Sequence, residues 1–98
     1  MINGNTRLLA HIGYPTQTFR SPMIYNPWFA HVGEDVVVVP FASQPDRYPA
    51  LLRALFGTGN VVGALITMPH KSTTPALLDR VSVAACIAGA CNAVRRAP

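Results

Sequence analysis

Four polar side chains of this chain are of types that together suit recognition of a small hydroxylated anion. Ser21 and Thr67 carry hydroxyls, Asn92 carries an amide, and Lys71 carries an ammonium. Hydroxyls and amides both donate and accept hydrogen bonds, whereas an ammonium only donates. The set therefore points to a polyhydroxylated, anionic small molecule as ligand.

Lys71 is the only lysine of the chain, and the other seven basic residues are arginines. Lysine differs from arginine because burial can lower its pKa far enough for proton transfer. Two interpretations stay open at this point. Lys71 is either a solvated cation at the end of a strand or a titratable group placed for acid–base chemistry.

Strand-like and helix-like segments alternate around these side chains. Short apolar runs closed by glycine or proline predict strands, and segments with an early proline and a terminal glycine predict helices. Ser21 is the expected N-cap of the first helix, Pro27 is expected to kink it, and the four valines at 36–39 predict a strand covered on both faces. The predicted strands cover 7–13, 35–41, 60–68 and, as the start of a strand, 91–94, and the predicted helices cover 21–33, 45–56, 74–78 and 82–88.

This order predicts an α/β fold in three layers, with a mainly parallel sheet and helices on both faces. In such folds, ligands bind beyond the carboxyl ends of the strands. The loop at 13–22 and the segment 67–71 follow two such ends, and Asn92 lies beside a glycine turn. We therefore expect these segments to converge at one edge of the sheet.

The length of 98 residues predicts one domain, and the chain is 50% hydrophobic but only 12% charged. So few charges suggest that part of the apolar surface meets another domain. The net charge of +4 does not indicate nucleic-acid binding, because the arginines are scattered and only Arg95 and Arg96 are adjacent. The end of the sequence, in the middle of a predicted strand, indicates a truncated chain.

The remaining motifs exclude several other functions. No apolar stretch is long enough for a membrane span, and no secretory signal is apparent. Cys86 and Cys91 have neither disulfide-exchange nor zinc spacing, so we expect two buried thiols and a cytoplasmic location. The histidines at 11, 31 and 70 are scattered, and we expect them to be structural or solvated.

The glycines of "GTGNVVG", at 57–63, imitate a dinucleotide fingerprint. A true fingerprint follows a strand and opens a helix, so that backbone amides face the pyrophosphate. Here the glycines follow a predicted helix and open a predicted strand. We therefore expect a helix C-cap and a turn.

The segments that carry the polar side chains resemble the N-terminal, substrate-binding domain of shikimate dehydrogenases. The resemblance runs from about residue 6 to residue 94 and includes "LLAHIGYP", "SPMIYN", "VVVVPF", "GALITMPHK" and "DRVSVAACIAGACNAV". The last two are similar to the family patterns G-x-N-V-T-x-P-x-K and D-x-x-x-x-x-A-x-x-x-G-A-x-N-T.

The resemblance implies a domain that holds shikimate or a related hydroxy-acid in an NADP-linked oxidoreductase of aromatic amino-acid biosynthesis. Lys71 matches the catalytic lysine, which moves the hydroxyl proton together with an aspartate that would lie beyond Pro98. Thr67 and Asn92 match contacts to substrate hydroxyls, and Ser21 matches the second serine of a carboxylate-binding pair. The NADP-binding Rossmann domain is expected to be absent from this chain, and a homodimer stays open.

Several positions depart from the family pattern. Phe19 stands where the first serine of the carboxylate pair is expected, Leu65 stands where an asparagine is common, and Ala93 replaces a threonine. Arg20 lies between Phe19 and Ser21 and could bind a carboxylate through its guanidinium. The alternative is an arginine that points to solvent.

Two classes of function follow from this pattern. The first is the substrate half of a shikimate-type or quinate-type dehydrogenase. The second is a non-catalytic module that binds a shikimate-like ligand, with a non-functional gene remnant as a weaker third reading.

Overall fold

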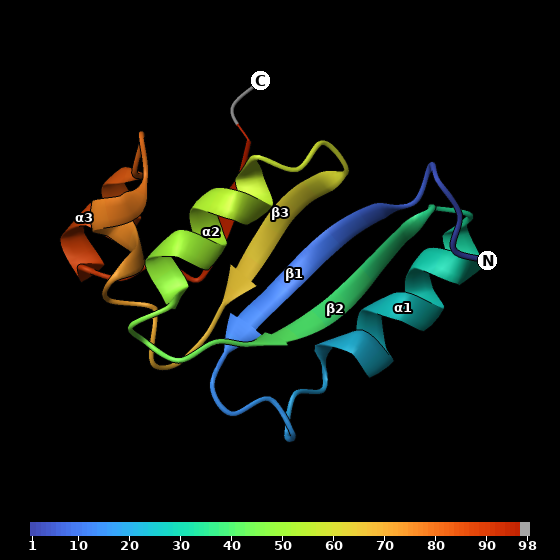
Figure 1. Cartoon of the computed structure of the whole chain (residues 1–98), viewed down its shortest axis with the longest axis horizontal. Coiled ribbons are helices and arrows are strands. Elements are labelled where there is room, and N and C mark those ends of the chain that lie inside the picture. The colour runs from blue at the N-terminus through green and yellow to red at the C-terminus, as the bar shows by residue number, and fades with distance from the viewer. Residues whose placement is uncertain (97–98) are drawn as a thin grey trace.

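A four-stranded sheet with the strand order β2-β1-β3-β4 forms the centre of the molecule (Figure 1). The computed structural model describes residues 1–96, without the side chains of Val83 and Cys86. Strands β1 (Arg7–Gly13), β2 (Val36–Ala42) and β3 (Val61–Ile66) are parallel, and the short β4 (Ala93–Arg95) runs antiparallel to β3. The predicted mainly parallel α/β sheet is confirmed.

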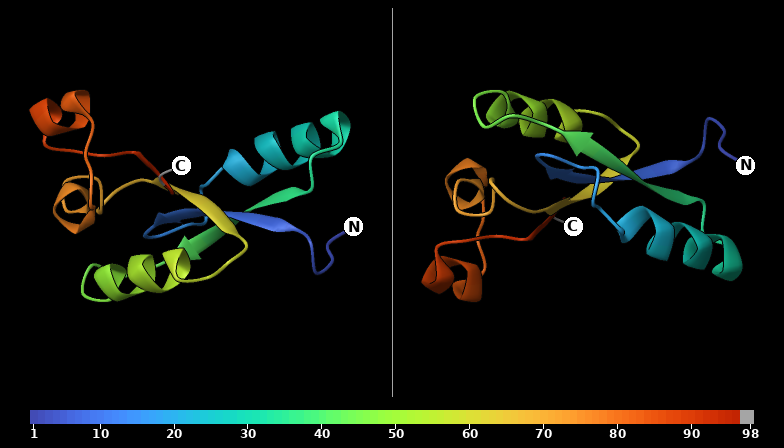
Figure 2. Two further views of the ribbon diagram at one scale, coloured as in Figure 1. Left: turned by 90° about the horizontal axis from the view of Figure 1, so that it is seen from above. Right: turned by 90° about the horizontal axis from the view of Figure 1, so that it is seen from below.

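Helices α1 (Ser21–Val32) and α2 (Tyr48–Phe56) cover opposite faces of the sheet, as Figure 2 shows. The connection from β1 to β2 and the connection from β2 to β3 cross the sheet in opposite directions. Two right-handed crossovers in opposite directions must place their helices on opposite faces. A 3₁₀ helix, η1 (Thr74–Leu77), and the short α3 (Val83–Ala88) follow β3 along the chain.

The hydrophobic core lies between the sheet and α2. Its buried members are two residues from each of β1, α2 and β3: Ala10, Ile12, Tyr48, Leu52, Ala64 and Ile66. Helix α1 has no fully buried residue. Its exposed large apolar side chains are Met23, Ile24, Tyr25, Trp28 and Val32.

The expectation that β2 is covered on both faces needs correction. Strand β2 lies at an edge of the sheet, and only Val38 of its valines is fully buried, so the valine run is not covered on both faces. The side-chain amide of Asn26 donates to the Val38 carbonyl at 3.0 Å and accepts from the Val38 amide at 2.7 Å. This pair satisfies backbone groups that an edge strand would otherwise leave open.

The helix starts also differ from the expectations. Arg20, not Ser21, is the N-cap of α1, because Ser21 is already helical and directs its hydroxyl to His11. The helix continues through Pro27 to Val32 and ends at Gly33, whose φ of 77° is left-handed. Helix α2 begins at Tyr48 rather than at residue 45, after a turn in which the Arg47 amide donates to the Gln44 carbonyl.

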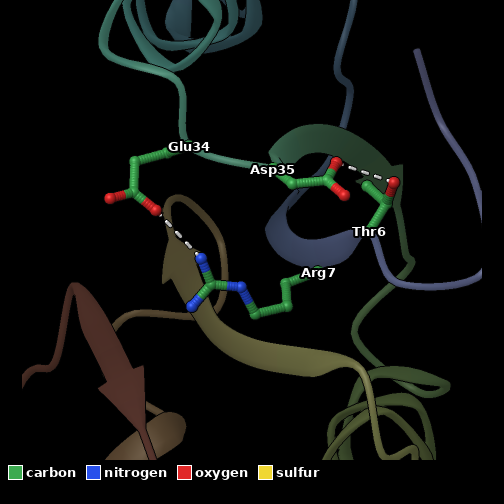
Figure 3. Close-up of polar contacts among 4 residues, drawn as sticks. All are labelled: Thr6, Arg7, Glu34 and Asp35. Carbon is green, nitrogen blue, oxygen red and sulfur yellow. Dashed lines mark hydrogen bonds and ion pairs between the residues drawn. The ribbon is translucent and has the colours of Figure 1, made fainter.

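The amino ends of β1 and β2, opposite the strand ends that carry the predicted site, are joined by polar contacts (Figure 3). The Thr6 hydroxyl donates to Asp35 at 2.8 Å, and Arg7 forms an ion pair with Glu34 at 3.1 Å. The Arg7–Glu34 pair is half exposed, so it contributes little to stability. The Thr6–Asp35 hydrogen bond, which is partly buried, helps to fix the register between the two strands.

Candidate functional site

The carboxyl ends of β1 and β3 lie side by side, and the loops that leave them begin at the same edge of the sheet. The Thr67 amide donates to the Ile12 carbonyl at 3.0 Å, and the Tyr14 amide donates to the Met68 carbonyl at 3.2 Å. Each strand is followed by a cis peptide bond to proline, Tyr14–Pro15 and Met68–Pro69. The expected convergence of these two loops is therefore present.

Gly13 is the point where Phe19 and Thr67 come together. A β-carbon at this position would overlap Cγ2 of Thr67 and lie 2.7 Å from Cζ of Phe19 and 3.0 Å from the Met68 carbonyl oxygen. Gly13 is itself buried. Only glycine leaves room for both side chains to pack against the end of β1.

Replacing Gly13 by alanine is expected to destabilise the chain by about 1–3 kcal/mol, because the added methyl group must displace Thr67 and Phe19. Chemical denaturation measures this loss. Gly59→Ala is the matched control, since a β-carbon there meets nothing within 4 Å. Equal stability of the two variants would contradict the close packing at Gly13.

Ser21 lies in the first turn of α1 and its hydroxyl is hydrogen-bonded to Nδ1 of His11 in β1. The His11 ring stacks on the ring of Phe19, with 4.2 Å between centroids and an interplanar angle of 23°. Burial lowers the pKa of His11 below its ordinary value. The sequence predicts His11 to be structural or solvated, and its only signal for a role at the site is a lone imidazole within an apolar strand.

Backbone hydrogen bonds hold the segments that carry Lys71 and Asn92 close to each other. The Cys91 amide donates to the Lys71 carbonyl at 2.9 Å, and the Ile66 amide donates to the Asn92 carbonyl at 2.9 Å. Both residues line a pocket of about 390 Å³. Its other lining residues are mostly small, which leaves the space open: Ser82, Ala84, Ala85, Ala88, Ala90, Cys91 and Ala93.

A buried polar network anchors the segment that carries Lys71. The imidazole of His70, 1% exposed, contacts the Ser43 carbonyl through Nε2 at 2.7 Å and stacks on Tyr48 at 4.0 Å. The Thr74 hydroxyl donates to the His70 carbonyl at 2.7 Å and is bonded to the Tyr48 hydroxyl at 2.7 Å. His70 is thus structural, as expected, and it ties the Lys71 segment to β2 and α2.

The predicted site residues therefore form two neighbouring groups. Phe19, Ser21 and Thr67 gather around the end of β1, and Lys71 and Asn92 border the pocket beside α3. Thr67 links the groups, because its carbonyl accepts from the amide of His70, the residue before Lys71. The sixth residue, Arg20, is exposed at the N-cap of α1, and its side chain forms no hydrogen bond to any of residues 1–96.

The glycines at 57–63 serve the fold, as the sequence predicts. Gly57 is the C-cap of α2, and its amide donates to the carbonyls of Arg53 and Ala54. Gly63 lies within β3, where a β-carbon would come within 2.8 Å of the Val94 carbonyl oxygen, so it permits β4 to pair. The glycines at 57–63 do not fit a dinucleotide phosphate, because the Gly57 amide at the end of α2 already donates to carbonyls of that helix.

The remaining expectations concern cysteines, metals and membranes. Cys91 is a buried free thiol, and the side chain of Cys86 lies outside the described residues. Among the described side chains of residues 1–96, which leave out Cys86, no three acidic, cysteine or histidine residues gather in a way that could hold a metal ion. The helices in this part of the chain are all too short or too polar to cross a membrane.

The chain is similar to known proteins of one family along most of its length. The family described as "Shikimate dehydrogenase substrate binding domain" matches residues 11–94. The chain is 42% identical over 96 residues to shikimate dehydrogenase (NADP(+)) of Nostoc sp. strain PCC 7120, covering 98% of this chain and 33% of that protein. The corresponding protein of Acidiphilium cryptum is 39% identical over 92 residues, covering 94% of this chain and 33% of its own length.

Solved structures show the same fold. Shikimate 5-dehydrogenase from Listeria monocytogenes, in complex with shikimate and NAD, matches with a TM-score of 0.92 and 30% identity, over 98% of this chain and 33% of that one. Shikimate dehydrogenase from Aquifex aeolicus matches with a TM-score of 0.90 and 30% identity, over 97% of this chain and 35% of that one. The chain thus spans about a third of the length of its relatives.

Proposed function

This chain belongs to the shikimate dehydrogenase substrate binding domain family, and we propose that it holds the substrate of an NADP-dependent shikimate-type dehydrogenase. The observation that carries the proposal is the placement of hydroxyl, amide and ammonium residues around the carboxyl ends of β1 and β3. Ser21 and Thr67 lie around the end of β1, and Lys71 and Asn92 border the adjoining pocket. The substrate proposed is shikimate or a closely related ring hydroxy-acid.

Each proposed role is the one that the family resemblance implies, and the chemistry of each side chain is compatible with it. The Ser21 hydroxyl binds the substrate carboxylate, and the amide of Asn92 and the hydroxyl of Thr67 bind ring hydroxyls. Lys71 takes up or returns the proton of the hydroxyl that is oxidised or formed. Phe19 narrows the part of the site proposed to bind the carboxylate, because its ring lies next to Gly13 and stacks on His11.

NADP, when bound, supplies or accepts the hydride of such a reaction. The glycines at 57–63 do not fit its phosphates, so we propose that a separate domain of the whole protein binds the cofactor. The relatives are about three times as long as this chain, which supports that arrangement.

A binding measurement tests the proposal directly. Titration of the 98-residue chain with shikimate and with quinate should produce saturable chemical-shift changes at Ser21, Thr67 and Asn92. Assays of the whole protein with NADP then separate the two classes of function. Binding without turnover would favour the non-catalytic module, and the absence of binding to either acid would refute the proposal.

Arg20→Ala should weaken the binding of carboxylate ligands by about twofold to fivefold, the range of an exposed charge-assisted contact. Arg20 is placed for this role one residue before Ser21 and is exposed. Isothermal titration with shikimate measures the change, and Arg53→Ala on the exposed side of α2 is the matched control. An unchanged affinity in Arg20→Ala would show that this arginine only faces solvent.

The cellular location and the pathway of the enzyme are proposed from the same family resemblance. We place it in the cytoplasm, in the shikimate step of aromatic amino-acid biosynthesis. The exposed apolar side chains of α1 are proposed to be covered in the whole protein, by the cofactor domain or by a second copy in a homodimer. Sedimentation of the chain and of the whole protein distinguishes a cofactor domain that covers α1 from a second copy that covers it.

A further inference from the structure

The imidazole of His11 contacts both Ser21 and Phe19, the two residues at the part of the site where we propose that the substrate carboxylate binds. Its Nδ1 is hydrogen-bonded to the Ser21 hydroxyl, and its ring stacks on Phe19 at 4.2 Å. The stacking restrains the ring while the hydrogen bond fixes which nitrogen faces Ser21. His11 is therefore held in one orientation against the Ser21 hydroxyl, which we propose binds the substrate carboxylate.

The neighbours of His11 carry no charge. Strand register places it beside Pro40 of β2 and Leu65 of β3, and Leu65 pairs in turn with Ala93 of β4. Residues in register on adjacent strands present their side chains on the same face of the sheet. From α1 and the preceding loop the ring meets Ser21 and Phe19, and the nearest charged residue along that loop is the exposed Arg20.

We propose that His11 is a positioning residue for the Ser21 hydroxyl, and that binding of a substrate carboxylate at Ser21 is coupled to the protonation state of His11. The inference rests on the proposed function and adds to it a residue that controls affinity. It is carried by the His11–Ser21 hydrogen bond and the Phe19 stack.

The coupling follows from the direction of one hydrogen bond. In the neutral tautomer with hydrogen on Nε2, Nδ1 accepts the Ser21 hydrogen, so Ser21 cannot donate to a carboxylate. When Nδ1 carries hydrogen, the ring donates to the Ser21 oxygen and the hydroxyl hydrogen is free for the ligand. The imidazolium cation always has hydrogen on Nδ1, so protonation and carboxylate binding favour each other.

The sign of the pH dependence follows. Burial lowers the pKa of His11, so the free site is mostly neutral near pH 7. As pH falls through the pKa of His11, the cation fraction grows and affinity for the carboxylate should rise. The reciprocal effect is that bound carboxylate raises the pKa of His11.

The test compares the full 98-residue chain with two variants by titration with shikimate and with its methyl ester, which keeps the hydroxyls but lacks the charge. For the wild type, shikimate affinity should rise roughly fivefold or more between pH 7.5 and pH 5.5, and ester affinity should rise less, because the uncharged ester carbonyl accepts a weaker hydrogen bond from Ser21 than the carboxylate does. In His11→Asn the side-chain amide can still donate to Ser21 but does not titrate, so binding should persist without the pH dependence. In Ser21→Ala the pH dependence should also disappear.

Histidine nitrogen spectra of the free chain give a second readout that needs no ligand. Ser21→Ala should change the tautomer balance and the pKa of His11. An unchanged His11 spectrum in Ser21→Ala, or an unchanged pH profile in His11→Asn, would overturn the inference while leaving shikimate binding intact. Failure of the wild type to bind shikimate at any pH would instead refute the proposed function, and the spectra would still decide whether His11 positions Ser21.

Discussion

Lys71→Ala is expected to lower the kcat of the whole enzyme by about 10²–10⁴-fold, because the side chain proposed to move the hydroxyl proton is removed. The KM for shikimate should change much less, since a proton transfer contributes mainly in the transition state. The fold of the chain should be unaffected. The Lys71 side chain forms no hydrogen bond or ion pair with the described residues, and only its carbonyl is used, by the Cys91 amide.

Lys71→Arg is the matched control for this prediction. Arginine keeps the positive charge but stays protonated at any accessible pH, so it cannot transfer a proton. If Lys71 acts in acid–base chemistry, both variants lose turnover to a similar degree. Near-normal turnover in Lys71→Arg would reduce the role of Lys71 to charge, and normal turnover in Lys71→Ala would remove it from the mechanism. Steady-state kinetics with shikimate and NADP measures both.

His70→Ala is expected to have the largest effect on stability, a loss of about 2–4 kcal/mol. The substitution removes the ring that stacks on Tyr48 and leaves the Ser43 carbonyl without its 2.7 Å partner inside the protein. It also leaves a cavity, because His70 is 1% exposed. Urea denaturation followed by circular dichroism measures the change in the free energy of unfolding.

His31→Ala is the control for that experiment, since it removes the same side chain from an exposed position on α1. Its effect on the free energy of unfolding should stay within about 0.5 kcal/mol. If the two variants were equally stable, the network around His70 would not hold the Lys71 segment. His70→Ala should also broaden the amide resonances of residues 70–74, since the contacts from His70 to Ser43 and Tyr48 are lost.

The fold class was predictable because its determinants are local. Apolar runs broken by Gly13, Gly33 and Gly57 separate strands from helices, and the glycine at 33 has the left-handed φ that ends a helix. Alternation of strands and helices then leaves a parallel sheet with helices on both faces as the favoured arrangement. The order of the strands within the sheet is not local, so the edge position of β2 could not be read from its valines.

The candidate site was predictable to the extent that it follows strand ends. Thr67 and the loop containing Ser21 had to meet because parallel strands end at a common edge, and the structure places them around Gly13. The residue types suggested the ligand chemistry, and the family resemblance suggested the individual roles. That Lys71 and Asn92 line the same pocket depended on a hydrogen bond between backbone groups far apart in the chain, at Cys91 and Lys71.

The amino-acid sequence alone therefore determined the elements, the strand ends at which we propose the site, and the side chains available there. Only the tertiary structure decided that His11 meets Ser21, that Phe19 stacks on that imidazole, and that His70 is a buried anchor. The physical reason is that periodicity and capping act within a few residues. Contacts between side chains from different elements depend on strand order, register and crossover direction, which are fixed when the core packs.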